Sequence, residues 1–318
     1  MKNIGIKREI GIVLKQLRNG KGLSQTLLAN LINCSKMTII RIENGERLPQ
    51  PYTLHQMLSA LDISHEDFDA LLNGTNMLQF NQDFAHIWDV CFAGDYKTMS
   101  DMLNELKTKE YCNVERLDIA QALLLCDSII LASNEKYNES LDVLYSALQK
   151  TTSKNLIKQN AINCAKVKKS TFSMNEYRIL KEIANVKADL GEKQEAIKIF
   201  EALMVSLESE TANYEIKKKL LPSIYFNMSC ILLDDELYTK AFDVIEKGLQ
   251  FSKITKEFKV IGELIWNKGR VLYNTNNIEQ ATVLFQQSYI HFVNCEDDMT
   301  AKRLKKVAKE KYNITIDN

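Results

Sequence analysis

The chain has 318 residues, of which 45% are hydrophobic and 26% charged. This length and composition are typical of a globular protein with about two domains. Only 3 prolines and 11 glycines occur, which leaves little room for many hairpin turns, so we expect an all-α fold. No apolar run approaches the ~20 residues of a membrane span, and charges interrupt the N-terminal stretch where a signal peptide would be apolar.

Seven cysteines are scattered along the sequence without a C-x-x-C pair. We interpret them as reduced thiols and expect a cytoplasmic protein with no membrane partner. The net charge of zero hides an asymmetry, because residues 1–50 contain nine Lys or Arg against three acids, which gives +6. A cationic N-terminal module favours a phosphate backbone as partner, although the same charge also suits plain solubility.

Apolar spacing and caps predict five short helices in the first 72 residues. The first covers residues 6–17, the second starts after the N-cap candidate Ser24, and the third starts after Ser35 and ends at Gly45. Two further helices are expected at 53–61 and 65–72. Two short helices joined by a tight turn, with a cation at the start of the second, are typical of a helix-turn-helix domain.

One stretch resembles the Xre/lambda-repressor type of helix-turn-helix domain along its whole length: LKQLRNGKGLSQTLLANLINCSKMTIIRIENGERLPQPYTLHQMLSALDIS. The resemblance implies DNA binding by Gln25, Ser35, Lys36, Met37, Thr38, Arg41, Asn44 and Arg47. Gln25 would clamp a phosphate or a neighbouring side chain. Lys36 and Arg41 would contact guanine and Met37 a thymine methyl, unless Lys36 is merely solvated or Met37 merely tolerated. The resemblance also implies a structural ion pair between Arg18 and Glu43.

We predict a helix-turn-helix domain over residues 1–72, a linker over 73–79, a repeat domain over 80–296 and a C-terminal capping helix over 297–318. The repeat domain shows a recurring turn that ends on a small residue in four of its five copies. These turns end at Met99, Ser140, Ala196, Ala241 and Ala281, which are 41, 56, 45 and 40 residues apart. This recurrence predicts about five helical hairpins with connections of varied length.

The repeat extends into the helices on both sides of each turn. Small residues precede the last four turn positions by twelve residues, at Ser128, Ala184, Ser229 and Gly269. Large ones follow by four, at Leu144, Phe200, Ile245 and Phe285, and mostly small ones by seven, at Ala147, Leu203, Gly248 and Ser288. This is similar to the tetratricopeptide pattern and predicts a right-handed helical solenoid that binds peptide on its concave side.

Asparagines recur on the predicted concave side. Asn227 and Asn267 occupy the same repeat position, and Asn185 lies nearby on its own helix. An amide can donate to and accept from a peptide backbone, so we predict a peptide site made of Asn185, Asn227, Asn267, Arg178, Arg270 and Tyr273. Two alternatives are that the asparagines bond neighbouring helices and that Arg270 pairs with Glu263 or Glu279.

The combination of an Xre-type domain with loosened tetratricopeptide repeats resembles the RRNPP group of peptide-pheromone receptors of Gram-positive bacteria. The resemblance implies a transcription regulator for quorum sensing that binds a short imported signalling peptide. It also implies a homodimer, or a tetramer, that docks its paired helix-turn-helix domains on an inverted repeat in double-stranded DNA. The peptide's identity, the operator and the sign of regulation do not follow from the sequence.

Two other classes of function compete with this hypothesis. In the first, the repeats bind a folded protein partner in place of a free peptide. The second is an enzyme, which we do not expect: no phosphate-binding glycine motif is present, and His55, His65, His86 and His291 have no metal-ligand spacing. A glutamine-based phosphatase role is the one enzymatic alternative left open. We therefore expect no cofactor, no metal and no catalytic residue.

Overall fold

The computed structural model describes residues 2–72, 75–109, 111–112, 114, 116–152, 156–158, 161–258 and 260–316. The chain divides into two compact units, Met1–Val114 and Glu115–Asn318, called the first and second unit below. The regular secondary structure of the described residues is helical apart from one short β-ladder, so the predicted all-α class is confirmed. Residues 73 and 74 of the predicted linker lie outside the described residues, and the predicted domain limits stay a prediction.

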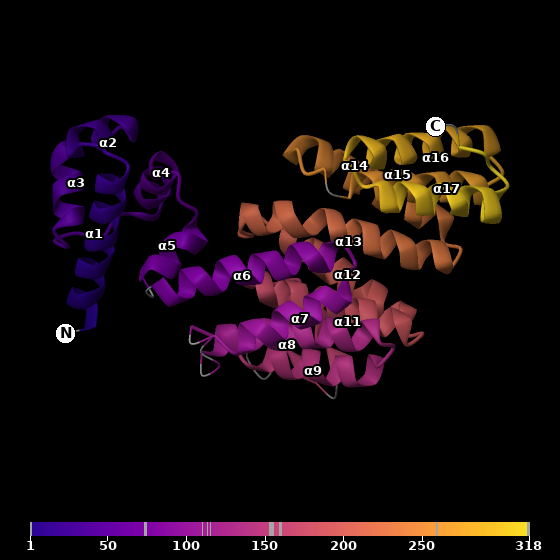
Figure 1. Ribbon diagram of the computed structural model, residues 1–318, viewed down its shortest axis with the longest axis horizontal. Coiled ribbons are helices and arrows are strands. Elements are labelled where there is room, and N and C mark those ends of the chain that lie inside the picture. Colours follow the sequence, from indigo (N-terminus) through magenta and orange to yellow (C-terminus); the bar gives the residue numbers. More distant parts are fainter. Residues whose placement is uncertain are drawn as a thin grey trace. The chain divides into compact units, whose positions relative to one another are not determined.

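The first unit contains the five predicted helices and one helical hairpin (Figure 1). The helices are α1 (Lys2–Gly20), α2 (Gln25–Leu31), α3 (Lys36–Glu43), α4 (Pro51–Leu61), α5 (His65–Leu72), α6 (Thr75–Phe92) and α7 (Tyr96–Lys107). α4 begins two residues earlier than predicted because a proline fits the first helical turn, where its missing N–H has no intrahelical partner.

Local capping sets the limits of α2 and α3. The Ser24 hydroxyl accepts a hydrogen bond from Leu27 N at 3.1 Å, and the Ser35 hydroxyl accepts one from Thr38 N at 3.1 Å. Each cap satisfies one of the N–H groups that a helix start leaves without an intrahelical acceptor. α3 ends before Gly45, which has a left-handed φ of 71°. Both N-caps and the glycine stop are therefore confirmed.

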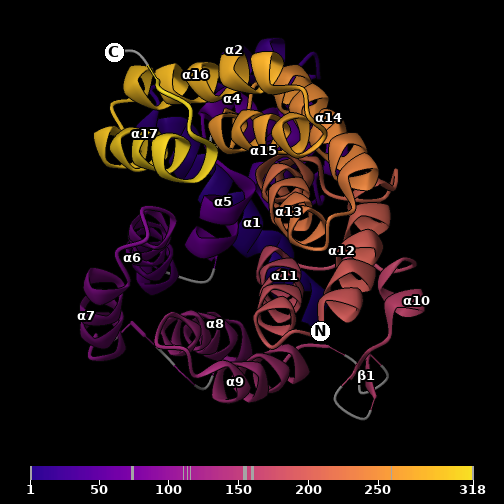
Figure 2. The same ribbon diagram turned by 90° about the vertical axis from the view of Figure 1, so that its right-hand side faces the viewer.

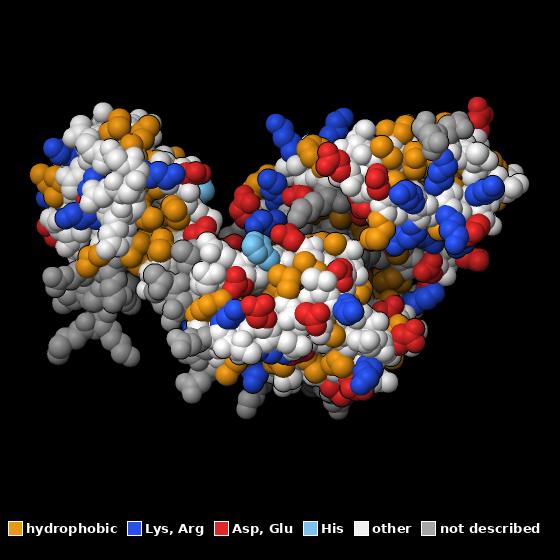
Figure 3. Space-filling view, viewed as in Figure 1, with side chains coloured by type: hydrophobic (Ala, Val, Ile, Leu, Met, Phe, Trp, Pro, Cys, Tyr) orange, Lys and Arg blue, Asp and Glu red, His pale blue; other side chains and the backbone are white. Residues whose placement is uncertain are grey.

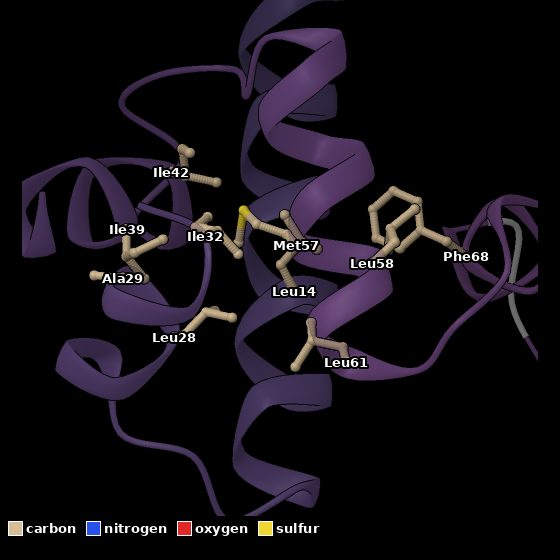
Figure 4. Packing of buried hydrophobic residues seen from close by; sticks show 10 residues of the cluster. All are labelled: Leu14, Leu28, Ala29, Ile32, Ile39, Ile42, Met57, Leu58, Leu61 and Phe68. Carbon is tan, nitrogen blue, oxygen red and sulfur yellow. The ribbon is translucent and has the colours of Figure 1, made fainter. Parts of the chain in front are cut away.

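The core of the helix-turn-helix region gathers side chains from α1 to α5 (Figure 4). It consists of Leu14, Leu28, Ala29, Ile32, Ile39, Ile42, Met57, Leu58, Leu61 and Phe68, all at most 3% exposed. Ile39 and Ile42 come from α3, so one stripe of this short helix is fixed in the core. Burying such a side chain contributes roughly 1.5–3 kcal/mol, which holds the other stripe in a defined orientation.

The second unit is a stack of helical hairpins that curves into an arc (Figure 2). Its helices are α8 (Leu117–Ser133), α9 (Tyr137–Gln149), α10 (Cys164–Val167), α11 (Met174–Asp189), α12 (Lys193–Glu208), α13 (Tyr214–Asp234), α14 (Tyr238–Thr255), α15 (Ile261–Asn274), α16 (Ile278–Asn294) and α17 (Asp298–Tyr312). α8, α11, α13 and α15 follow the inner side of the arc, whereas α9, α12, α14 and α16 follow the outer side.

A short β-ladder interrupts the helices between α9 and α10. β1 (Ile157–Lys158) pairs antiparallel with β2 (Ala161–Ile162), with Ile157 opposite Ile162. This ladder was not predictable from the sequence, because two residues per strand give no alternating pattern. None of the described helices combines the length and the apolar character that crossing a membrane requires.

The predicted repeat register is confirmed by burial. The turn positions Ser140, Ala196, Ala241 and Ala281 are all 0% exposed, and their partners twelve residues earlier are buried as well. The Ser140 hydroxyl donates to the Ser128 carbonyl oxygen at 2.8 Å, which shows how closely two helices approach at this crossing. Small side chains at these positions therefore set the distance between the helices of each hairpin.

The predicted C-terminal helix is α17. Its apolar stripe packs on Trp266 and Phe285, and after the left-handed Asn313 the buried side chains of Ile314 and Ile316 extend the same cluster. The solvated stripe is cationic and carries Lys302, Arg303, Lys305, Lys306, Lys309 and Lys311 (Figure 3). This arrangement covers the apolar end of the stack with a polar surface, as a terminal repeat requires.

Substituting Gly269 tests the close helix crossing in the last hairpin. A Cβ at this position would lie 2.7 Å from Cε1 of Phe285, so we expect Gly269→Ala to lower the free energy of unfolding by about 1–3 kcal/mol. Urea unfolding followed by tryptophan fluorescence measures the change. Gly20→Ala is the control, because a Cβ there meets nothing within 4 Å. Equal effects of the two substitutions would contradict the proposed role of the crossing.

Candidate functional site

The outward side of α3 presents the residues predicted to contact DNA. Ser35, Lys36, Arg41, Asn44 and Arg47 are exposed, Met37 is 54% exposed, and Thr38 is half-buried. Within the described part of the chain, the side chains of Lys36, Arg41 and Arg47 form no hydrogen bond or ion pair. Three cations with free donors therefore lie on or just after a helix whose opposite stripe is fixed in the core.

A buried ion pair ties α1 to the end of α3. Arg18 Nε and Nη2 donate to the Glu43 carboxylate at 2.6 and 2.9 Å, and Arg18 Nη1 donates to the Leu23 carbonyl oxygen at 2.7 Å. Both residues are almost fully buried, at 6% and 4% exposure. The hydrogen bonds that Arg18 donates to Glu43 raise the pKa of Arg18 above its ordinary value. The guanidinium is therefore fully charged and bidentate, the geometry that most favours such a pair.

Gln25 joins this network at the start of α2. Its Nε2 donates to Glu43 Oε2 at 2.8 Å, so the amide binds a neighbouring side chain, one of its two predicted roles. Its contact with a phosphate stays a prediction. The other polar groups near α3 are also engaged locally, since Ser35 and Thr38 share a hydrogen bond of 2.9 Å and Asn44 donates to Glu46 at 3.1 Å.

In the second unit, hydrogen bonds connect the predicted asparagines across the inner helices. Asn227 Nδ2 of α13 donates to Asn185 Oδ1 of α11 at 2.9 Å, and Asn185 Nδ2 donates to Glu182 at 2.8 Å. Both asparagines are half-buried. Asn227 Oδ1 has no hydrogen bond within the described residues, so this carbonyl remains able to accept one.

Asn267 lies in a different environment from Asn227, although both occupy the same repeat position. It is only 2% exposed, and its Nδ2 donates to Ser229 Oγ at 2.8 Å and to Cys230 Sγ at 3.2 Å. Arg270 Nη1 donates to Asn267 Oδ1 at 3.2 Å, which engages the other end of the amide. Its predicted contact with a peptide stays a prediction, and in this structure its amide is used between helices.

Arg270 pairs with an acid that the sequence analysis did not consider. Its Nη2 donates to Asp234 Oδ1 of α13 at 3.0 Å, so neither Glu263 nor Glu279 is its ion-pair partner. The signal for Asp234 was its position seven residues after Asn227, which places it two turns further along the same stripe. We define the inner face by the bonded residues Glu182, Asn185, Asn227, Cys230, Asp234, Asn267 and Arg270.

The last two predicted peptide contacts differ in their surroundings. Arg178 lies one turn before Glu182 on α11, and its Nη1 donates to Asn175 at 3.4 Å, so it continues the stripe of the inner face. Tyr273 packs its ring on Tyr312 of α17, with centroids 4.8 Å apart, and contacts the apolar cluster at the end of the unit. Tyr273 therefore contributes mainly to the packing between helices and is not one of the bonded residues of the inner face.

Glu263 adds a buried carboxyl group one turn before Asn267. The residue is half-buried, and its Oε2 is enclosed without a hydrogen-bond partner. Burial raises the pKa of Glu263 to about 7; a backbone hydrogen bond within the residue and the charge of Arg303 oppose the shift, and Asp297 adds to it. An enclosed carboxylate oxygen without a partner is costly, which explains why the proton is retained near neutral pH.

Comparison with protein families assigns both parts of the sequence. Residues 14–68 match a helix-turn-helix family, and residues 146–313 match the RNPP family C-terminal domain. The second match covers more than half of the 318 residues. The chain belongs to the RNPP family, which confirms the predicted membership of the RRNPP group. No curated protein matches the sequence.

Solved structures share the fold over nearly the whole chain. Bacillus thuringiensis PlcR in complex with the peptide PapR7 and DNA is 21% identical, with a TM-score of 0.69 over 93% of this chain and 99% of that one. ComR from S. thermophilus in complex with DNA and its signalling peptide ComS is 17% identical, with a TM-score of 0.58 over 93% and 97%. Streptococcus dysgalactiae SHP pheromone receptor Rgg2 is 15% identical, with a TM-score of 0.57 over 95% and 99%.

Removing Glu43 tests the ion pair that holds α3. We expect Glu43→Ala to lower the free energy of unfolding of the helix-turn-helix region by about 3–5 kcal/mol, since Arg18 would stay buried without a counter-charge. Hydrogen exchange of the amides in α1 to α3 of the full chain measures this locally. The control is Lys21→Ala, which removes an exposed pair with Asp62 at 3.5 Å and should cost less than about 1 kcal/mol. Similar exchange in both variants would contradict the account.

The raised pKa of Glu263 predicts a pH dependence of stability. Between its ordinary value of 4.5 and about 7, the unfolded chain loses this proton while the folded chain keeps it. The free energy of unfolding should therefore fall as pH rises through this window, by up to about 3 kcal/mol at ~1.4 kcal/mol per pKa unit. Urea unfolding at pH 5 and pH 8 should show this loss in the wild type relative to Glu263→Gln. Parallel curves for the two proteins would contradict the prediction.

Proposed function

We propose that this chain is a sequence-specific DNA-binding transcription regulator controlled by a short signalling peptide. α3 binds the major groove of double-stranded DNA, and the inner face of the second unit binds the peptide. The observation that carries the proposal is the pairing of an exposed, core-anchored cationic helix with a row of amides in one chain. The solved relatives with the same fold include complexes with DNA and a signalling peptide.

The DNA-binding role rests on how α3 is held. Its inner stripe is fixed by the core and by the Arg18 and Glu43 pair, so Lys36, Met37 and Arg41 are presented by a rigid helix. A guanidinium or ammonium on such a helix can donate to guanine O6 and N7, whereas the Met37 side chain can contact a thymine methyl. Arg47, beyond the end of α3, is suited to a phosphate, which fixes position without specifying sequence.

Peptide binding rests on unused hydrogen-bonding capacity of the inner face. Asn227 Oδ1 can accept an N–H from an extended peptide while its Nδ2 stays bonded to Asn185. The bond between the two amides fixes their orientation before a ligand arrives, which lowers the entropic cost of binding. Because an amide binds the peptide backbone, this contact gives affinity, and other residues of the face must give specificity.

Coupling between the two sites would follow from assembly. We propose a homodimer, or a tetramer, whose paired α3 helices bind the two halves of an inverted repeat. A peptide that prefers one geometry of the assembly by a few kcal/mol changes the population of that geometry by orders of magnitude. The effect is reciprocal, so bound DNA changes the affinity for the peptide by the same factor. The protein acts by binding and carries out no catalysis.

Substituting Arg41 tests the DNA-binding role. We expect Arg41→Ala to weaken binding to a duplex selected from random sequences by about 1–3 kcal/mol and to relax the preference at one base pair. Fluorescence anisotropy at fixed salt measures this for the selected duplex and for duplexes with single base-pair changes. Lys302→Ala on α17 is the control, because it also removes one exposed charge but lies in the second unit.

Equal losses for Arg41→Ala on the selected duplex and on random DNA would contradict base recognition. If the wild type showed no sequence-specific DNA binding, the proposed function itself would be overturned. The wild type could also bind DNA while its repeats bind a folded protein and no free peptide. That result would favour the alternative of a regulator controlled by a protein partner.

A further inference from the structure

One carboxyl group next to the inner face has no ion-pair partner among the described residues. Glu263 precedes Asn267 by four residues and Arg270 by seven on α15, so the three side chains share one stripe of the helix. Asn267 and Arg270 are bonded to Cys230 and Asp234 of α13, which fixes this stripe toward the neighbouring inner helix. Glu263 also lies close enough to Cys230 to influence its titration.

The polar groups around Glu263 have hydrogen-bond or ion-pair partners within the chain. Both ends of the Asn267 amide are bonded, and the positive charge of Arg270 is paired with Asp234 at 3.0 Å. Glu263 differs, because its Oε2 is enclosed without a hydrogen bond and no cation lies within ion-pair distance among the described residues. Arg303 of α17 is the cation that acts on it electrostatically, from beyond that distance.

The free energy of this arrangement improves if a cation reaches the carboxyl group. Removing a carboxylate from water costs several kcal/mol unless a charged donor replaces the lost solvation. Glu263 is half-buried, so part of the residue is reachable from solvent although its Oε2 is enclosed. Arg270 would not repel such a group, since Asp234 already balances its charge.

We propose that Glu263 is a specificity-determining residue of the inner face and that it binds a positively charged group of the peptide. The group is an ammonium or guanidinium, supplied by a Lys or Arg side chain or by the free N-terminus. The inference rests on the proposed function, because it requires that a peptide lies on the inner face. The amides bind the peptide backbone and do not distinguish one peptide from another. Glu263 would distinguish peptides by their side chains or by their N-terminus.

Three synthetic pools of random heptapeptides without Asp or Glu test this inference. The first contains Lys and Arg and is N-acetylated. The second lacks Lys and Arg but has a free N-terminus. The third lacks Lys and Arg and is N-acetylated, so it carries no cation of either kind. Each pool is mixed with the full chain, and the retained peptides are separated by gel filtration and identified by mass spectrometry. The proteins are the wild type, Glu263→Gln and the control Glu279→Gln, which neutralises an exposed acid of α16.

We expect the wild type and Glu279→Gln to retain peptides of the first or second pool at least tenfold over the third. Glu263→Gln should lose this preference while it retains peptides of the third pool at the wild-type level, which also shows that it is folded. The first and second pools distinguish a side chain from the N-terminus as the source of the charge.

Three outcomes would overturn the inference. Retention of all three pools without a charge preference in the wild type, or the same preference in Glu263→Gln, would contradict the role of Glu263 and leave the peptide-binding function standing. Retention of no pool by the wild type would overturn the peptide-binding function and the inference with it. The failure of one is therefore distinguishable from the failure of the other.

Discussion

The close approach of helices at small buried residues is the constraint on which the second unit depends. At Ser128 and Ser140, and again at Gly269, the helices pack with no space for a larger side chain. This packing holds the two helices of each hairpin together. Between successive inner helices, Asn227 bonds Asn185 and Arg270 bonds Asp234. Two groups of short polar bonds lie along the inner side of the arc, one around Asn185 and Asn227 and one around Asn267 and Arg270.

A comparable constraint operates in the first unit, with charge in place of size. The buried pair of Arg18 and Glu43 fixes the end of α3, and Gln25 extends the same network to the start of α2. In both units the described residues include polar groups that the networks leave without a partner. They include the cations of α3 in the first unit and the Asn227 carbonyl and the enclosed Glu263 Oε2 in the second.

Local signals made most of the fold predictable from the sequence. Ser24 and Ser35 set helix starts through their hydroxyl caps, and Gly45 sets a helix end through its left-handed backbone. The repeat of small residues predicted the hairpins without any knowledge of contacts. The details of the inner face were not predictable in the same way. Which acid pairs with Arg270 and how deeply Asn267 is buried depend on the offset between neighbouring helices, which intrahelical spacing does not determine.

The central claim is that a peptide and DNA bind the same chain and influence each other. The most direct measurement is the affinity of the purified protein for the DNA upstream of its own gene, at fixed salt, with and without the peptide fraction of a producing culture. The account predicts a change of at least tenfold, which corresponds to about 1.4 kcal/mol of coupling. Tight DNA binding that is indifferent to the peptide fraction would contradict it.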